Sequence, residues 1–375
     1  MNICIVGWYG TETMGDIAIL DGILSVIDHI DNKSKVLLGS LYPFYTERTL
    51  YEEREVFKSS APNLSIKIFD IKEKKTRDKS IAISDLIIMG GGPLMDLDEL
   101  YIIKKCFRLA YRKGIPTIIM GCGIGPLIEE NHIKCVKQIL DYSTLISFRD
   151  NISLHNAKSL FGDNPKYRCL GDPAIISIEN YKKKNKVCNY SEEAIVNMRQ
   201  FPNEYGKRKN ITDDDMKVFL MSLSKHYSSV RFIPMHTFCI GGDDRRYAIE
   251  LLHQNEQNNI FIQQKPMNLH ELYAIFAKSK ICIGMRYHAV VMQTIINGNN
   301  YILDYTNQAS GKISSFIREI DKVGFYNNRI FNLQKENSRE KMLSLISSPT
   351  ESRFSYQYST MKEDYISFIN ELLNR

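Results

Sequence analysis

Residues 280–298 read KICIGMRYHAVVMQTIING, an apolar run that ends in glycine and passes directly into a helical pattern. The run predicts a buried strand, and the pattern that opens at Arg286 predicts a helix packed beside it. Arg286 and His288 would then lie in the first helical turn, where a positive charge opposes the helix dipole by about 0.3–1 kcal/mol. A phosphate or carboxylate ligand opposite them would remove that penalty.

The alternation of short apolar runs with longer helical patterns extends outward from this stretch over most of the chain. It is typical of α/β domains whose parallel sheet is covered by helices on both faces. Strands are predicted at Ile3–Val6, Lys35–Leu38, Ser65–Phe69, Leu86–Met89, Thr117–Met120, Leu145–Phe148, Tyr167–Leu170, Ala194–Arg199, Val230–Met235, Ile260–Ile262 and Ile281–Ile283. Helices are predicted between them, including Asp213–Tyr227, Asp243–His253 and Asn268–Lys278.

The length of 375 residues exceeds what a single hydrophobic core usually supports, so two domains are expected. The stretch IISIENYKKKNK, residues 175–186, shows no apolar period and is interpreted as the linker. We therefore predict two Rossmann-like, doubly wound domains at 1–178 and 179–335 that face a cleft. Residues 336–375 are expected to form terminal helices, which in two-lobed proteins commonly pack back on the first domain.

Composition narrows the class of protein. The apolar runs are far shorter than the roughly 18 residues needed to cross a bilayer, and the start of the chain lacks a basic n-region, which favours the cytoplasm. Eight cysteines without a CxxC pair are typical of reduced thiols rather than of disulfides or a structural metal site. The net charge of +6 is spread along the chain, so it favours anionic small molecules or an acceptor at the inner face of the membrane over nucleic acid.

Glycine-rich segments follow three predicted strands of the first domain: GWYGTETMGD at 7–16, GGGPLMD at 90–96 and GCGIGP at 121–126. Ligands of open α/β sheets bind beyond the carboxyl ends of strands, where glycine allows close approach of the backbone. The segments are expected to converge on one cleft, although each could instead only form a tight turn. The glycines counted as binding candidates are Gly15, Gly91, Gly92 and Gly123.

Neither common nucleotide motif is present, since the first segment lacks GxGxxG spacing and the chain has no GxxxxGK[ST]. Asp16 and Asp96 close two of the glycine segments and could orient hydroxyl groups or act as a base. Helix capping or loop hydrogen bonding is the alternative role for both carboxylates.

Cationic side chains follow further strands. Arg149, in SFRDNIS, could bind substrate, with a surface cation beside an Asp150 helix cap as the alternative. Arg199 and Arg286 follow two strands of the second domain. Each would offer a guanidinium with two parallel N–H groups, so each anionic group of a doubly anionic ligand could be bound by one arginine. His236 could contact the same ligand or be a structural histidine.

His288 is the preferred candidate for proton transfer, because imidazole titrates near neutrality and Arg286 projects into the same turn. The alternative is a core histidine that bonds a backbone carbonyl. Nothing in this constellation requires a metal.

The order of these segments resembles the polysaccharide pyruvyltransferases. The stretches that carry the resemblance, in chain order, are GWYGTETMGDIAIL, DLIIMGGGPLMD, GCGIGP, FRDNIS, GDPA, VNMR, FIPMH with a later Asp-Asp, and MRYHAVVMQTIINGNNYILDY. They cover residues 3–305. Trp8, Thr13 and Ile17 depart from the usual first segment, and Tyr287 stands where an aliphatic residue is common.

The resemblance implies a fold similar to the GT-B glycosyltransferases and the transfer of pyruvate from phosphoenolpyruvate to a sugar as a cyclic ketal. It places the donor contacts on Arg286, His288 and Arg199, with Tyr287 added as a neighbouring substrate-binding candidate. It implies no cofactor, and an acceptor that is a sugar or a lipid-linked oligosaccharide, which would make peripheral membrane association possible. A nucleotide-sugar glycosyltransferase of the same architecture, or a sugar- or anion-binding protein without catalysis, are the alternatives.

Overall fold

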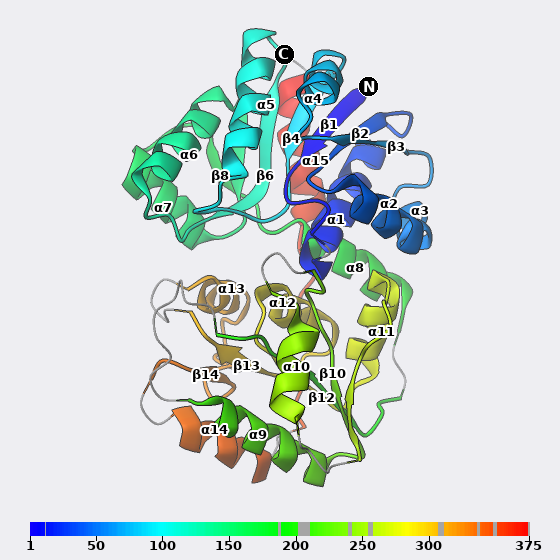
Figure 1. The fold of residues 1–375 in the computed structure, drawn as a ribbon, viewed down its shortest axis with the longest axis vertical. Coiled ribbons are helices and arrows are strands. Elements are labelled where there is room, and N and C mark those ends of the chain that lie inside the picture. Colours follow the sequence, from blue (N-terminus) through cyan, green and yellow to red (C-terminus); the bar gives the residue numbers. More distant parts are fainter. Residues whose placement is uncertain are drawn as a thin grey trace. The chain divides into compact units, whose positions relative to one another are not determined.

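The structure, a computed structural model, describes residues 1–11, 13–186, 189–201, 211–238, 242–253, 258–306, 311–335, 338–347 and 351–373. Contacts divide the chain into two compact units, which we call unit 1 (Met1–Asn180 with Ser359–Arg375) and unit 2 (Tyr181–Tyr358). Each unit is a parallel sheet with helices packed on it (Figure 1). The sequence prediction of two doubly wound parallel-sheet folds is thereby confirmed.

Unit 1 holds an eight-stranded sheet in the order β3-β2-β1-β4-β6-β7-β8, with the short β5 paired to β6. Its strands are β1 (Asn2–Val6), β2 (Lys35–Ser40), β3 (Ser65–Asp70), β4 (Leu86–Met89), β5 (Pro93–Leu94), β6 (Thr117–Ile124), β7 (Leu145–Phe148) and β8 (Tyr167–Cys169). Its helices are α1 (Met14–Ile30), α2 (Pro43–Glu52), α3 (Arg54–Ser60), α4 (Lys74–Ala82), α5 (Leu100–Arg112), α6 (Glu130–Tyr142), α7 (Asn151–Phe161) and α15 (Met361–Leu373).

The central strands of unit 1 are buried along their whole length. Every residue of β4, β6 and β7 is buried, which is why these strands read as unbroken apolar runs rather than as alternating ones. Helix α5 buries residues spaced at helical intervals, from Leu100 through Ile103 and Phe107 to Ala110, against that sheet. The polar groups of the unit are therefore left at the strand ends and on the outer helix faces.

Unit 2 holds a six-stranded sheet in the order β11-β10-β9-β12-β13-β14. Its strands are β9 (Glu193–Asn197), β10 (Ser229–Phe232), β11 (Ile260–Ile262), β12 (Ile281–Gly284), β13 (Asn300–Asp304) and β14 (Ile330–Asn332). Its helices are α9 (Asp213–His226), α10 (Asp244–Leu252), α11 (Leu269–Lys278), α12 (Tyr287–Ile296), α13 (Lys312–Ile320) and α14 (Ser338–Ser347). The order reverses between β9 and β12, as in classic dinucleotide-binding sheets.

The stretch interpreted as the linker contains the division between the two units, but it is a helix, α8 (Ala174–Lys184), although no apolar period was recognised in it. The side chains of Ile175, Ile176 and Ile178 are buried, while three consecutive lysines end the helix. Lysine near a helix carboxyl terminus is favoured by the dipole, so the lysine run that suggested a linker instead stabilises the last turn.

The carboxyl-terminal segment contributes to both units. Helix α14 packs on α9 within unit 2, whereas α15 packs on α1 within unit 1. The second of the helices expected within residues 336–375 begins only at Met361. Residues 351–360 run without regular structure, and the Phe354 amide among them donates to the carbonyl of Gly298. The terminal forty residues are thus two separate elements with different partners.

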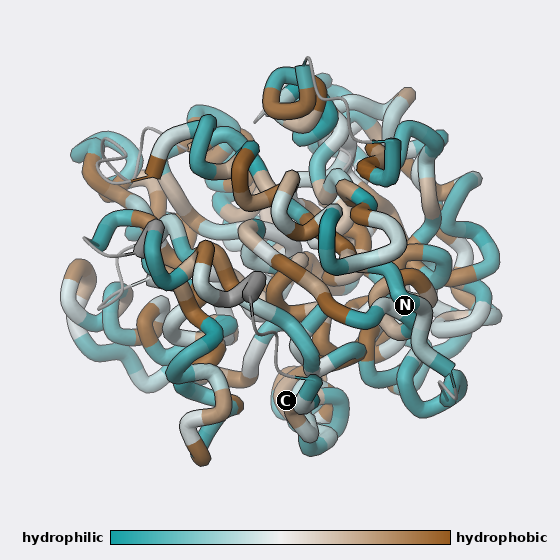
Figure 2. Tube along the Cα trace, turned by 90° about the horizontal axis from the view of Figure 1, so that it is seen from below, coloured by the Kyte–Doolittle hydropathy of each residue, from teal (hydrophilic) through white to brown (hydrophobic). Residues whose placement is uncertain are grey.

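Hydrophobic and hydrophilic residues are interspersed along the whole chain. Hydrophobic residues, in brown, alternate along the tube with hydrophilic residues, in teal (Figure 2). Among the helices in the described part of the chain, none combines the length and the apolar character needed to span a bilayer.

The attachment of α15 gives a prediction about stability. Tyr365 is fully buried, donates to the Gly171 carbonyl at 2.7 Å and lies 3.2 Å from the Ser147 hydroxyl. In Tyr365→Phe, the Gly171 carbonyl loses the hydrogen bond from this buried phenol, so the free energy of unfolding should fall by about 1 kcal/mol in denaturant titrations. Tyr111→Phe, at a 62% exposed position, is the control and should change stability little. Equal stability of the two variants would contradict this role.

Candidate functional site

The strand order of unit 2 locates its binding edge. Ligands of open α/β sheets bind beyond the carboxyl ends of the two strands between which the order reverses, here β9 and β12. Arg199 follows β9 and Arg286 follows β12, and the Arg199 amide contacts the Met285 sulfur at 3.4 Å. The two arginines therefore lie at the place where the topology favours a ligand.

Arg286 is the N-cap residue of α12, and its guanidinium meets a carboxylate from α10. Its Nε lies 2.8 Å from each carboxylate oxygen of Asp244, and Nη2 lies 2.6 Å from Oδ1. Nη2 also donates to the Gly242 carbonyl at 3.2 Å. Within the described residues Nη1 has no hydrogen-bond partner. The anion expected opposite Arg286 is thus supplied in part by the protein itself.

A second pair of cations surrounds Tyr305, which follows β13. The Arg199 guanidinium lies 5.8 Å and the Lys312 ammonium 5.9 Å from the centre of the Tyr305 ring. Lys312 is the first residue of α13, so it repeats the pattern of Arg286: a positive side chain at a helix amino terminus. Arg199, Arg286 and Lys312, which we call the cation cluster, come from three successive strand ends.

The cation cluster changes the acidity of Tyr305. Burial raises the pKa of this phenol, but the positive charges of Lys312, Arg199 and Arg286, with a hydrogen bond from Lys312, outweigh burial. The pKa therefore lies below the ordinary tyrosine value. A lowered tyrosine pKa indicates a positive electrostatic potential at this edge of the sheet. A site that binds an anion needs such a potential.

Tyr287 and His288 open α12. Tyr287 is buried against Phe316 of α13, with ring centres 6.2 Å apart, while His288 is half-buried with its ring centre 5.0 Å from that of Tyr287. The Lys312 ammonium lies 6.0 Å from the centre of the Tyr287 ring. Tyr287 therefore packs the first turn of α12 against the helix that carries Lys312.

His236 lies at the same edge but is buried. Its amide donates to Asp244 at 3.2 Å, and its carbonyl accepts from the Asp244 amide at 3.0 Å. The His236 backbone thus supports Asp244, the partner of Arg286.

In unit 1 the three glycine segments contact one another. A Cβ atom on Gly92 would lie 1.8 Å from the Trp8 ring, and one on Gly7 would lie 2.1 Å from the Gly90 carbonyl oxygen. The third segment is joined through a hydrogen bond of 2.9 Å from Gly125 to the Leu94 carbonyl. Close packing between segments therefore requires glycine at Gly92, whereas Gly91, with a φ of 95°, adopts a left-handed conformation.

Arg149 is buried beside Gly123. Its Nε lies 3.1 Å from Asp150, and a Cβ on Gly123 would lie 2.6 Å from its guanidinium carbon. Asp150 caps α7 by accepting from the Ser153 amide at 2.6 Å, as the capping alternative expected. Arg149 is therefore packed inside unit 1 rather than placed as a surface cation.

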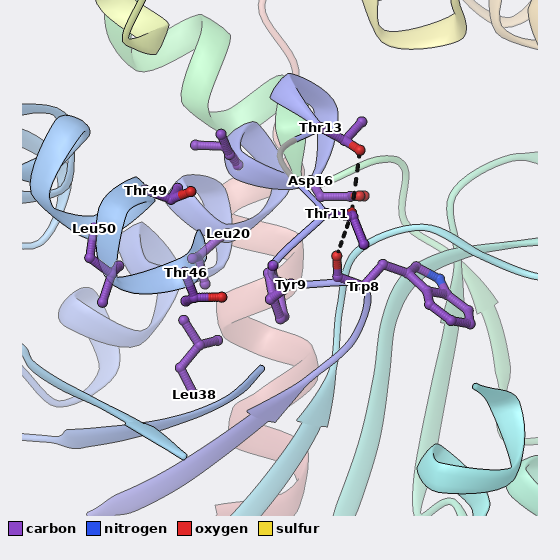
Figure 3. Close-up of a pocket in the computed structure, with 12 residues that line it drawn as sticks. Trp8, Tyr9, Thr11, Thr13, Asp16, Leu20, Leu38, Thr46, Thr49 and Leu50 are labelled. Atoms are coloured by element: carbon purple, nitrogen blue, oxygen red, sulfur yellow. Dashed lines mark hydrogen bonds between the residues drawn. The ribbon is translucent and has the colours of Figure 1, made fainter. Parts of the chain in front are cut away.

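Asp16 lies in the first turn of α1, three residues after the N-cap Thr13, and Gly15 is buried beside it. A cavity of about 20 Å³ is lined by Asp16 and Leu20 of α1 and by residues of α2 that include Thr49 (Figure 3). A space of this size takes one water-sized group. The described cavity has room for a group of about the size of a hydroxyl, and most of its lining is apolar.

Asp96 forms a loop contact. Its carboxylate accepts from the Ile128 amide at 2.7 Å and from the Glu129 amide at 3.3 Å, which joins the second glycine segment to the start of α6. His132 of α6 lies 3.4 Å away. These bonds match the loop-bonding alternative for Asp96.

The described cysteines are thiols. Cys4, Cys106, Cys122, Cys135, Cys169 and Cys282 are free, and burial raises the pKa of Cys106, Cys122 and Cys282 to about 12. Among the residues that the structure describes, no group of three or more His, Cys, Asp or Glu side chains is arranged to hold a metal ion.

Sequence reasoning missed Lys312, Tyr305 and the role of Asp244. A signal for Lys312 existed, because a glycine and a lysine open a helical pattern shortly after the strand that ends at Asp304. Asp244 follows the segment FIPMH, but only the fold reveals that its partner lies 42 positions away.

The acidity of Tyr305 can be tested by spectrophotometric titration at the phenolate band. The wild-type curve minus that of Tyr305→Phe should show one ionisation below the ordinary tyrosine pKa of about 10. Tyr227→Phe is the control, because burial first of all raises the pKa of Tyr227 to about 12 and its loss should leave the curve below pH 10 unchanged. A Tyr305 ionisation at or above the ordinary value would contradict the potential inferred for the cation cluster.

Comparison with solved structures supports the fold. The UDP-GlcNAc 2-epimerase of Neisseria meningitidis, solved bound to UDP-GlcNAc, is similar over 99% of this chain and 100% of its own, with a TM-score of 0.59 and 14% identity. The UDP-GlcNAc 2-epimerase of Methanocaldococcus jannaschii is similar over 99% of this chain and 100% of its own, with a TM-score of 0.62 and 11% identity. An alpha-glucosyltransferase, solved in complex with UDP-glucose and DNA containing an abasic site, is similar over 98% of this chain and 95% of its own, with a TM-score of 0.51 and 12% identity. At these identities the similarity concerns the fold, which is GT-B-like as predicted.

Sequence comparison identifies the family. No curated protein matches the chain significantly. The family model for polysaccharide pyruvyl transferase matches residues 14–292, about three quarters of the chain, and this range contains both Arg199 and Arg286. The resemblance noted from the sequence segments is confirmed. The chain therefore belongs to the polysaccharide pyruvyl transferase family, a family of transferases.

Proposed function

We propose that the protein transfers pyruvate from phosphoenolpyruvate to two hydroxyls of one sugar in a cell-surface polysaccharide or its precursor, forming a cyclic ketal. The observation that carries this proposal is the cation cluster at the strand ends of unit 2, with three positive side chains around the buried Tyr305. Family membership makes pyruvyl transfer the reaction to which that cluster is assigned.

Phosphoenolpyruvate carries a phosphate and a carboxylate on adjacent positions of a three-carbon frame, so it needs cations from more than one direction. Arg199 and Lys312 add positive charge beside the Tyr305 ring, while Arg286 offers Nη1 from a guanidinium fixed by Asp244. A planar guanidinium binds the oxygens of either anion with defined geometry, whereas an ammonium acts as a point charge. The cation cluster can therefore both orient phosphoenolpyruvate and neutralise its negative charge.

The proposed chemistry moves two protons. A proton is added to the methylene carbon of the enol ester, which makes C2 electrophilic, and one sugar hydroxyl attacks C2. The C2–O bond to phosphate then breaks, and a second hydroxyl closes the ketal. One hydroxyl proton balances the new methyl group and the other leaves with phosphate. His288, in the first turn of α12, is proposed to relay one of these protons.

Unit 1 is proposed to bind the acceptor. Asp16 lines a cavity that fits a hydroxyl, and Thr11 and Thr13 lie at the same place with their hydroxyl oxygens 3.4 Å apart (Figure 3). Carboxylate and hydroxyl groups in this arrangement suit hydrogen bonds to a sugar. Asp96 is given a supporting role, since its oxygens already accept from two backbone amides. We propose a sugar acceptor that is free or lipid-linked, and no nucleic acid.

The donor assignment is tested by thermal unfolding with and without ligand. Phosphoenolpyruvate at a hundredfold excess over its Kd should stabilise the protein by about 2.7 kcal/mol, and UDP or GDP should not. Arg199→Ala and Lys312→Ala should each weaken binding about tenfold or more, because each removes a charged contact. Arg246→Ala, at an exposed site on α10, is the matched control.

Turnover is measured as phosphate release from phosphoenolpyruvate in the presence of a panel of sugar acceptors. Stabilisation by a nucleoside diphosphate instead of phosphoenolpyruvate would favour a glycosyltransferase. Phosphate release without a ketal product would contradict pyruvyl transfer.

A further inference from the structure

Asp244 stands out because it is a carboxylate with almost no exposure and with donors on several sides. It is 1% exposed, and besides Arg286 it accepts from the amides of Met235 at 3.0 Å and His236 at 3.2 Å. A buried carboxylate is costly unless its oxygens are satisfied, and these bonds satisfy both. The arrangement holds the end of β10, the start of α10 and the Arg286 fork in one place.

Asn197, the last residue of β9, completes the arrangement. Its Oδ1 accepts from the Arg286 amide at 3.1 Å, and its Nδ2 donates to the Ile233 carbonyl at 2.9 Å and approaches Asp244 at 3.5 Å. Asn197 is fully buried. It therefore fixes the backbone of Arg286 while Asp244 fixes the side chain.

This geometry affects the positive charge of Arg286 and the direction of its N–H groups in different ways. Asp244 cancels much of its positive charge, so Arg286 attracts an anion less strongly than an isolated guanidinium would. Asp244 also occupies Nε and Nη2, which sets the plane of the guanidinium and leaves the Nη1 edge for another acceptor. Arg286 thus contributes direction more than charge.

We propose that Asp244, supported by Asn197, is a positioning residue for the transfer reaction that acts through Arg286 without touching substrate. The inference rests on the proposed function. Because Asp244 fixes the Arg286 guanidinium, an oxygen of phosphoenolpyruvate meets an N–H group that is already aligned for the reaction. Pre-alignment affects the reaction step more than the initial capture of an anion.

The expected signature is a split between kcat and KM. In Asp244→Asn the fork loses its charged partner and its alignment, so kcat should fall about 100-fold, the scale expected for a misplaced catalytic contact. The same change removes a negative charge from the cluster, so KM for phosphoenolpyruvate should stay unchanged or decrease. A purely structural loss would not lower kcat while keeping or tightening KM.

Asp243→Asn is the matched control. Asp243 is the neighbouring N-cap of α10 and binds Arg245 through its carboxylate, and asparagine also caps helices well. Its kcat should remain within about twofold of wild type. Asp244→Glu keeps the charge but displaces it by one methylene, so it should fold and still lower kcat at nearly constant KM. If Asp244→Asn does not fold, the kcat and KM of Asp244→Glu test the positioning role instead.

A ligand-free measurement separates this inference from the proposed function. In ¹⁵N-arginine spectra of the whole protein, the Arg286 Nε–H signal, assigned by its loss in Arg286→Lys, should exchange slowly with solvent. It should exchange at least tenfold faster in Asp244→Glu, because the fork is no longer held in place. If wild type transfers no pyruvate but this change is seen, the positioning stands and the reaction assignment fails. Fast exchange in wild type, or an unchanged kcat in both Asp244 variants, would overturn the positioning role.

Discussion

Parallel sheets buried on both faces confine the polar groups that the strands can present to the strand ends, and that constraint governs this protein. Strands such as β4 and β12 are buried throughout, so charged side chains can be placed only where these strands end. The reversal of strand order between β9 and β12 opens the edge that carries Arg199 and Arg286. The fold thus fixes where a ligand can bind before any residue decides which ligand it is.

The residues at that edge have separate electrostatic tasks. The buried Asp244 holds the Arg286 guanidinium, while Lys312 and Arg199 place positive charge near the phenol of Tyr305. An edge built from cations alone would attract anions without orienting them, and an edge of paired charges would orient without attracting. Combining both suits a small substrate with two acidic groups whose reacting carbon must be presented to a hydroxyl.

Much of the fold followed from the sequence, because buried parallel strands are unbroken apolar runs. Strands β4, β7 and β12 were predicted within one or two residues of their ends. Helix α8 was missed because its lysines obscured the buried isoleucines. At the site, the cations of one helical turn indicated an anion opposite Arg286, but periodicity cannot reveal pairing between residues 42 positions apart. Local sequence predicts the need for a countercharge, and tertiary contacts decide which group supplies it.

The most direct measurement is a crystal structure of the protein with phosphoenolpyruvate bound. The account predicts an oxygen of the ligand within about 3 Å of Arg286 Nη1, with the Asp244 bonds to Nε and Nη2 retained and Lys312 close to the second acidic group. Density for the ligand away from the carboxyl ends of β9 and β12, or an Arg286 side chain that leaves Asp244 to reach it, would contradict the account.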